Sequence, residues 1–179
     1  MDKVKLTKKY VLTGSAYSGK TTTIHELARY GFVTVPEAAT IIISEQLECG
    51  GMSLPWLKFD NFLEALMEKQ LELESKIQFG SEIAFVDRGI PDVLAYFKYV
   101  GIEPTLAYAK AFQEHRYDGI FLLDSIPGYQ QDKIRREPLQ MVQRLRILHE
   151  EAYWELGYDM AFVPVMSIAE RVKFIIDRI

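Results

Sequence analysis

The sequence is poor in the residues that usually build metal sites and disulfide frameworks. It has one cysteine, Cys49, and three histidines scattered over 179 residues. A single cysteine cannot form an internal disulfide, and no Cys or His spacing here is typical of a zinc site. We therefore predict no zinc site, and we interpret Cys49 as a packed thiol rather than a nucleophile.

Long hydrophobic stretches and a strong net charge are missing too. No run reaches the roughly eighteen apolar residues of a membrane span, and residues 1–9 are polar, without an apolar signal segment. A net charge of −4 argues against a nucleic-acid partner held by a broad cationic surface. We expect one cytoplasmic domain over residues 1–179, with no membrane partner.

A phosphate-binding motif is the most informative feature that is present. Residues Gly14 to Thr21 fit the pattern G-x-x-x-x-G-K-[ST] at every fixed position. The two glycines let backbone N–H groups approach phosphates, Lys20 supplies a cation for the β- and γ-phosphates, and the Thr21 hydroxyl suits Mg²⁺. The alternative is a glycine-rich turn that binds nothing. The predicted nucleotide-binding residues are Gly14, Ser15, Ala16, Tyr17, Ser18, Gly19, Lys20, Thr21 and Thr22.

Short apolar runs of strand type alternate with helical patterns along the chain. The predicted strands are 10–12, 32–35, 83–86, 119–123 and 160–163. The first enters the phosphate-binding motif, and a helical pattern over 22–30 follows it. Two of the runs, 83–86 and 120–123, are continuously apolar, as strands buried on both faces should be. The pattern predicts an α/β fold with a parallel sheet covered by helices on both faces.

Helical patterns fill the segments between the strands. We expect helices within 37–79, interrupted at Cys49 to Gly51 and restarted at Ser53 with Pro55 in its first turn. Further helices are expected within 91–115, split near Gly101 and Pro104, over 138–156, and after Ser167. Apolar residues of the first segment are expected in the core: Phe62, Leu63, Leu66, Leu71, Leu73 and Ile77. The aromatic residues Trp56, Phe59, Tyr96, Phe97 and Tyr99 flank the expected cleft, where core packing is the default and stacking on a base the alternative.

Three residues at strand ends are the candidates for chemistry. Asp87 follows the buried strand 83–86, where its carboxylate can act on Mg²⁺; the alternative is a helix N-cap. Glu37 ends the second strand at the edge where ligands of open α/β sheets bind, and could accept the proton of an attacking hydroxyl or merely cap a helix. Arg88 could hold a substrate. No acidic residue directly follows Asp87, where hydrolytic ATPases commonly have one. The chain is therefore less well equipped to activate a water molecule for ATP hydrolysis.

Clustered cations lie between the fourth strand and the last long helix. Residues 129–138 form a candidate lid in which Arg135 or Arg136 stabilises the transferring phosphoryl group and closure excludes water. The alternative is a solvated basic helix start that pairs with Asp132 and Glu137. The sequence does not separate the two arginines.

These features together resemble the P-loop kinases of nucleosides and nucleotides. More closely, the later phrases look like the AAA-type ATPase/kinase domain family that includes the ribosylnicotinamide kinase domain of NadR-like proteins. Those phrases are Asp132 to Arg136, Tyr153 to Tyr158, Val163-Pro164, Ser167 and Glu170 to Val172. A ring-forming AAA+ machine fits poorly, because a small helical domain and the acid after Asp87 are lacking.

The resemblance carries further expectations. It implies a five-stranded parallel sheet of order 2-3-1-4-5, ATP with Mg²⁺, and an adenine edge near residues 163–165. It implies Asp87 for the metal or acceptor, Arg88 and Glu37 for the acceptor, and the lid arginines for the phosphoryl group. The acceptor would be a small molecule that offers a hydroxyl or a phosphate.

Two functional hypotheses follow from the sequence. The first is a Mg²⁺-dependent kinase that transfers the γ-phosphate of ATP to a small nucleoside-like or related metabolite. The second is an ATP-dependent regulatory switch or slow ATPase that acts through a protein partner. The guanine-recognition motif N-K-x-D is absent, which counts against a GTPase switch. A kinase of polynucleotide ends is disfavoured by the acidic composition.

Overall fold

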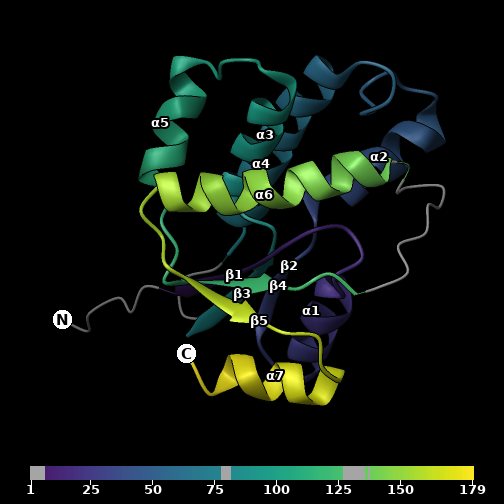
Figure 1. Cartoon of the computed structure of the whole chain (residues 1–179). Coiled ribbons are helices and arrows are strands. Elements are labelled where there is room, and N and C mark those ends of the chain that lie inside the picture. Colours follow the sequence, from purple (N-terminus) through teal and green to yellow (C-terminus); the bar gives the residue numbers. More distant parts are fainter. Residues whose placement is uncertain (1–6, 78–81, 127–135, 137) are drawn as a thin grey trace.

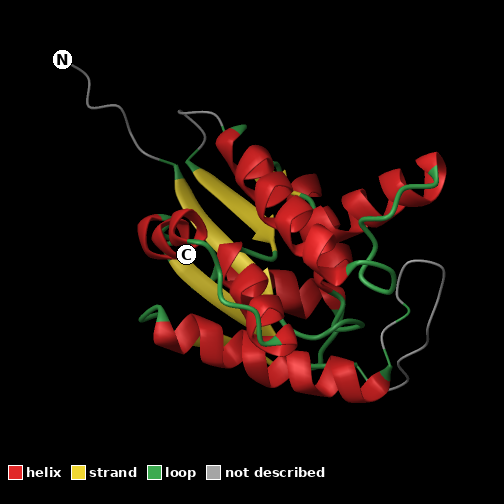
Figure 2. Ribbon diagram, turned by 90° about the horizontal axis from the view of Figure 1, so that it is seen from above, coloured by secondary structure: helices red, strands yellow, loops and turns green. Residues whose placement is uncertain are grey.

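Five parallel strands form one central sheet in the computed structural model, which describes residues 7–77, 82–126, 136 and 138–179. The strands are β1 (Lys8–Thr13), β2 (Val33–Val35), β3 (Ile83–Asp87), β4 (Gly119–Leu123) and β5 (Met160–Val163). They are ordered β2-β3-β1-β4-β5, and every pairing is parallel. This confirms the predicted α/β P-loop fold. The strands lie side by side among the helices in Figure 2.

Seven helices in the described part of the chain form layers on the two faces of the sheet. They are α1 (Lys20–Arg29), α2 (Ala38–Cys49), α3 (Phe59–Ser75), α4 (Ile90–Val100), α5 (Leu106–Glu114), α6 (Leu139–Glu155) and α7 (Ile168–Ile176). In Figure 1, α1 and α7 lie below the sheet and α2 to α6 lie above it. The cavity described below forms beside the layer of α2 to α6.

Alternation along the strands explains both layers, because successive side chains of a strand point to opposite faces. Val11 of β1 packs in the core under α2 to α6 together with Val86 and Ile120. Its neighbours Tyr10 and Leu12 pack in the second core, with α1 and α7. The central strands are thus apolar on both faces, which explains their continuous hydrophobic runs.

The helix predicted to restart at Ser53 begins six residues later, at Phe59. The backbone carbonyl of Leu54 accepts hydrogen bonds from the N–H groups of Leu57 and Lys58, at 3.0 and 3.1 Å, so residues 54–58 form a turn instead. Pro55 therefore lies in this turn and not in the first turn of α3. The apolar residues expected in the core of this segment are buried or pack against it.

The other helix ends agree closely with the sequence. The helix after Ser167 begins with a capping box, in which the Ser167 hydroxyl accepts from the N–H of Glu170 and the Glu170 carboxylate accepts from that of Ser167. No helix in the described residues is long and apolar enough to cross a membrane.

The sheet order decides where the site lies. β1 is hydrogen-bonded to β3 on one side and to β4 on the other, so the chain leaves β1 at the point where the strand order reverses. Ligands of open α/β sheets bind in the crevice at this point. The register places Leu12 of β1 beside Asp87 of β3, which brings the loop after β1 next to the end of β3.

Replacing Leu27 tests the layer formed by α1 and α7. Its side chain is fully buried in that core, so we expect Leu27→Ala to lower the free energy of unfolding by about 2 to 5 kcal/mol. The measurement is urea unfolding followed by circular dichroism. Leu106→Ala is the matched control, because Leu106 is 92 % exposed and its loss should change stability by about 0.5 kcal/mol or less. Equal effects of the two substitutions would contradict the assigned packing.

Candidate functional site

The loop between β1 and α1 has two positions that only glycine fits. Gly14 has φ of 132°, and a Cβ there would lie 2.5 Å from the backbone oxygen of Leu123. Gly19 has φ of 79°, and a Cβ there would lie 2.6 Å from Nη1 of Arg171. The Arg171 guanidinium of α7 is buried and donates a hydrogen bond of 2.8 Å to the Ser18 carbonyl. β4 and α7 therefore pack directly against the motif and hold it in place.

The side-chain amine of Lys20 lies within this loop. Its Nζ donates to the backbone oxygens of Gly14 and Ser15, at 3.2 and 2.8 Å, and to the Ser18 hydroxyl at 3.2 Å. Burial, together with the nearby positive charge of Arg88, lowers the pKa of Lys20 to about 8. An anion at the loop would favour the charged form of this amine, and Lys20 is the first residue of α1, whose N-terminus also attracts anions.

A cavity of about 400 Å³ opens at this loop. Its lining begins with eight of the nine residues predicted to bind nucleotide, Ser15 to Thr22, while Gly14 lies behind them. It continues past the phosphate-binding loop to Glu37, Thr40, Ile43, Arg88, Tyr96, Ile126, Val142, Leu145 and His149, with Ala39. The volume is in the range of sites that take small organic molecules.

Thr21 and Asp87 lie in contact, while their role as metal ligands stays a prediction. The Thr21 hydroxyl donates a hydrogen bond of 2.9 Å to Oδ2 of Asp87. The other oxygen, Oδ1, is buried and has no hydrogen-bond partner in the described structure. Burial and the negative charge of Glu37 raise the pKa of Asp87 to about 6. The helix-cap alternative does not hold, because α4 begins at Ile90 and its N-cap residue is Gly89.

Glu37 forms a buried ion pair with Arg88, although the two residues are 51 positions apart. Nε of Arg88 donates to Oε1 of Glu37 at 2.7 Å, and the Thr40 hydroxyl donates to Oε2 at 2.7 Å. Burial works against ionisation, but the charges of Arg88 and then Lys20 prevail and lower the pKa of Glu37 to about 2. Glu37 occupies the N-cap position of α2 without a capping hydrogen bond from its side chain. Its carboxylate is turned to Arg88 instead.

The backbone of Arg88 is held in a conformation that non-glycine residues rarely adopt. Its φ is 66°, in the left-handed region, which costs of order 1 to 3 kcal/mol. The N–H of Arg88 donates to the Leu12 carbonyl at 3.0 Å, and the Gln70 side-chain amide donates to the Arg88 carbonyl at 3.0 Å. These bonds hold the strained turn that directs the guanidinium toward Glu37.

Asp92 completes the arrangement, and the sequence reasoning missed it. Its carboxylate accepts from Nη1 of Arg88 at 3.0 Å, from the hydroxyls of Thr13 and Tyr153 at 2.5 and 2.6 Å, and from the N–H of Gly89 at 2.9 Å. The available signal was position: an acidic residue three places after Gly89, at the start of a helix. Arg88 thus lies between two carboxylates.

His149 of α6 is the second residue that was missed, and nothing in its spacing pointed to it. Burial, with Arg88 and Lys20 adding to it against the opposing charge of Asp92, lowers the pKa of His149 to about 3. Its Nε2 lies 3.5 Å from Nη1 of Arg88, and its ring packs edge-on against Tyr96. Its Nδ1 is buried without a hydrogen-bond partner in the described residues. The site therefore includes a neutral imidazole.

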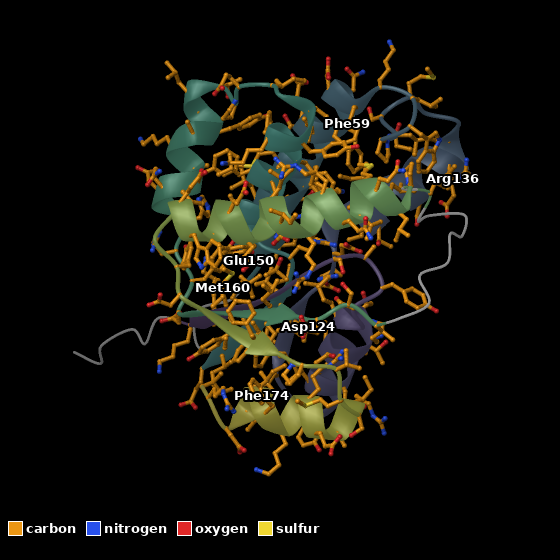
Figure 3. All side chains as sticks on the ribbon, viewed as in Figure 1. Phe59, Asp124, Arg136, Glu150, Met160 and Phe174 are labelled. Atoms are coloured by element: carbon orange, nitrogen blue, oxygen red, sulfur yellow. The ribbon has the colours of Figure 1, made fainter. Side chains whose placement is uncertain are left out.

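The predicted lid lies largely outside the described residues, which include Arg136 and Pro138 but not Arg135. Arg136 lies near the start of α6 in Figure 3, and its guanidinium stacks over the Trp56 ring at 4.5 Å from the centroid. Its position links the end of the candidate lid to the segment between α2 and α3. A role of either arginine at a phosphoryl group stays a prediction.

Two smaller expectations have mixed outcomes. Cys49 was expected to be packed, but it is exposed, because it is the last residue of α2 and points away from the core.

Among the candidate aromatic residues, Tyr96 lines the cavity. Phe97 is buried in the core, and Trp56 and Phe59 pack against it. Tyr99 is partly exposed and packs near Phe59.

Comparison with protein families decides the membership of the chain. A family model described as "AAA domain" matches residues 9–171, nearly the whole chain. The chain belongs to this AAA domain family. The five-stranded sheet and the phosphate-binding loop agree with this membership, and the fold is that of the P-loop NTPases.

Solved structures show the same fold at low sequence identity. Thymidylate kinase from Ehrlichia chaffeensis has a TM-score of 0.69 at 18 % identity, covering 96 % of this chain and 98 % of its own. Deoxyadenosine kinase from M. mycoides has a TM-score of 0.63 at 13 % identity, covering 95 % and 97 %. NadR in complex with NR has a TM-score of 0.73 at 18 % identity, and this AAA domain covers 50 % of that chain. No curated protein matches this chain in a sequence search.

The buried imidazole of this AAA domain should make its stability depend on pH. Because the pKa of His149 falls from 6.5 to about 3 on folding, only the unfolded chain takes up this proton as the pH falls below about 6.5. Stability should therefore decrease with falling pH between those values, with a contribution approaching about 1.4 kcal/mol per pH unit.

The measurement compares urea unfolding of the wild type and His149→Asn from pH 7 to pH 5. In this range the unfolded wild-type chain takes up about one proton at His149 that the folded chain does not. The wild type should lose stability more steeply than the variant. His25→Asn, at an exposed position on α1, should keep the wild-type slope. Parallel pH profiles for the wild type and His149→Asn would show that the imidazole is not held neutral.

Proposed function

We propose that this protein is an ATP-dependent kinase that transfers the γ-phosphate to a small nucleoside-like or related metabolite. The observation that carries the proposal is the continuous cavity that joins the phosphate-binding loop to Glu37 and Arg88. A nucleotide switch needs the loop alone. A second set of buried charged residues on the wall of the same cavity is what a phosphate acceptor would need.

ATP would be held by the loop from Gly14 to Thr22. Its phosphates would meet the backbone N–H groups at the start of α1 and the amine of Lys20, which would exchange its present loop contacts for phosphate oxygens. Mg²⁺ fits the oxygen atoms of Thr21 and Asp87, since Oδ1 of Asp87 is buried and unpartnered in the described structure. Bound there, the cation would neutralise charge on the phosphates.

The transfer step follows from the position of Glu37 on the cavity wall. The acceptor hydroxyl oxygen forms a bond to the γ-phosphorus, while the bond from that phosphorus to the bridging oxygen breaks and ADP leaves with its electron pair. The hydroxyl proton passes to Glu37 and then to water. Because its pKa is low, Glu37 is ionised at neutral pH, and its carboxylate can accept the proton as the new bond to phosphorus makes the hydroxyl acidic.

The comparisons support the class of reaction without naming the acceptor. The structural neighbours include one enzyme named for a nucleotide, thymidylate kinase, and one named for a nucleoside, deoxyadenosine kinase. Two features of the chain favour a kinase over a slow ATPase: the residue after Asp87 is an arginine, and the buried pair of Glu37 and Arg88 lines the cavity.

Lys20→Ala tests the nucleotide site. Removing a charged donor to phosphate should weaken ATP binding about 10- to 100-fold, measured by isothermal titration calorimetry. Lys173→Ala, on the exposed side of α7, is the matched control and should bind ATP as the wild type does. Unchanged affinity of Lys20→Ala would remove the phosphate-binding role of the loop.

Glu37→Gln tests the transfer step. The amide keeps the shape of the side chain and can still accept from Arg88, but it cannot take a proton, so we expect transfer to fall about 10²- to 10⁴-fold with ATP binding nearly unchanged. The assay detects phosphorylated products by mass across nucleosides, ribosylnicotinamide, nucleoside monophosphates and related vitamins.

Glu48→Gln, on the exposed end of α2, is the control and should transfer normally. Normal transfer by Glu37→Gln would exclude Glu37 as the proton acceptor. ATP binding without stimulation by any acceptor would favour the regulatory switch, and a protein partner would then be sought.

A further inference from the structure

The part of the cavity wall beyond the phosphate-binding loop, here called the far half, runs from Glu37 to His149 in the lining. Its described residues carry little free positive charge. Of the described residues that line the cavity, only Lys20 and Arg88 are cations, and Lys20 belongs to the phosphate-binding loop. Arg88 is bonded to two carboxylates, Glu37 at 2.7 Å and Asp92 at 3.0 Å. One guanidinium between two carboxylates, of which only Glu37 lines the cavity, leaves a net negative charge in this part of the described structure.

Glu37 brings that negative charge to the cavity wall. The charge of Arg88 holds the Glu37 pKa at about 2, so the carboxylate stays ionised at neutral pH. A phosphate monoester beside it would add like charge in a place shielded from water, where such repulsion is strong. A hydroxyl would be bound instead of repelled, because it can donate a hydrogen bond to a carboxylate oxygen. Each oxygen of a carboxylate can accept more than one hydrogen bond.

His149 adds a polar contact that carries no charge. Its Nε2 lies 3.5 Å from Nη1 of Arg88, which can only donate, and 3.7 Å from Oδ1 of Asp92, which is beyond hydrogen-bond distance. We therefore assign Nε2 as the acceptor and the ring proton to Nδ1. That Nδ1 is buried without a partner in the described structure. A buried donor without an acceptor costs free energy, and a ligand oxygen or ring nitrogen would remove this cost.

Apolar side chains form much of the remaining wall. Ile43 of α2 and Val142 and Leu145 of α6 line this half, with the ring of Tyr96 beside His149. Such a wall suits the faces of a ring rather than a chain of charged groups. Arg136, which is the described cation of the predicted lid, stacks over the Trp56 ring.

We propose that the acceptor is an uncharged, hydroxyl-bearing ring compound, of the nucleoside class, and that phosphomonoesters are rejected. In this assignment Glu37 receives the hydroxyl, and His149 is a specificity residue that donates from Nδ1 to an oxygen or nitrogen of the acceptor. The proposal rests on the kinase function above and goes further by selecting a hydroxyl over a phosphate as the accepting group.

The experiment uses the full chain with ATP and Mg²⁺ and matched pairs of acceptors. Purine, pyrimidine and pyridine nucleosides are each tested beside their own monophosphates, and products are identified by mass. We expect at least one nucleoside to be phosphorylated and its monophosphate to react at least about tenfold more slowly, the cost of one unfavourable charge contact.

His149 is tested by a pair of variants with the reactive nucleoside. His149→Leu should raise the acceptor KM about threefold to tenfold and leave the KM for ATP unchanged, since one hydrogen bond to a neutral group is lost. His149→Asn keeps a neutral N–H donor and should recover most of the affinity. His25→Leu, at an exposed position, is the control.

The outcomes separate the two proposals. Faster phosphorylation of monophosphates than of nucleosides would overturn the charge argument and leave the kinase function standing. ATP binding with no phosphorylation in either class would overturn the kinase function itself. An acceptor KM that His149→Leu does not change, or that rises together with the KM for ATP, would overturn the role of His149.

Discussion

The buried ion pair between Glu37 and Arg88 is the interaction on which the site depends. It joins the end of β2 to the end of β3, and through Asp92 it reaches α4 and the hydroxyl of Tyr153 on α6. Breaking one partner of a buried charge pair leaves the other uncompensated, which is strongly destabilising. The pair therefore sets both the shape and the charge of the cavity wall around it.

The phosphate-binding half depends on a different constraint, close approach. Gly14 packs against the backbone of Leu123, and Gly19 packs against the guanidinium of Arg171. Neither position has room for a Cβ, so the loop follows β4 and α7 closely. The two halves meet at Asp87, which contacts Thr21 of the loop and lies one residue before Arg88. Asp87 thus connects the phosphate-binding motif to the buried pair of Glu37 and Arg88.

Many of the residues that line the cavity could be selected from the local sequence, for a physical reason. The motif from Gly14 to Thr21 works through backbone shape and adjacent side chains, so its residues lie close together in the chain. Asp87 and Glu37 were found because parallel strands bring their carboxyl ends to one edge. Cys49 was misjudged because its burial depends on which face of α2 is covered, and the turn before α3 because Pro55 fits a turn as well as a helix start.

The sequence by itself determined the fold class and the position of the phosphate-binding motif, because both follow from local pattern, while the strand order came from the resemblance to a family. Only the tertiary structure decided that Arg88 lies between Glu37 and Asp92, and that His149 is buried and neutral beside them. Glu37 and Arg88 lie just after β2 and β3, and Asp92 and His149 lie on α4 and α6, up to 112 positions apart in the chain. The electrostatics of a shared cavity depends on distances between elements, which local pattern does not encode.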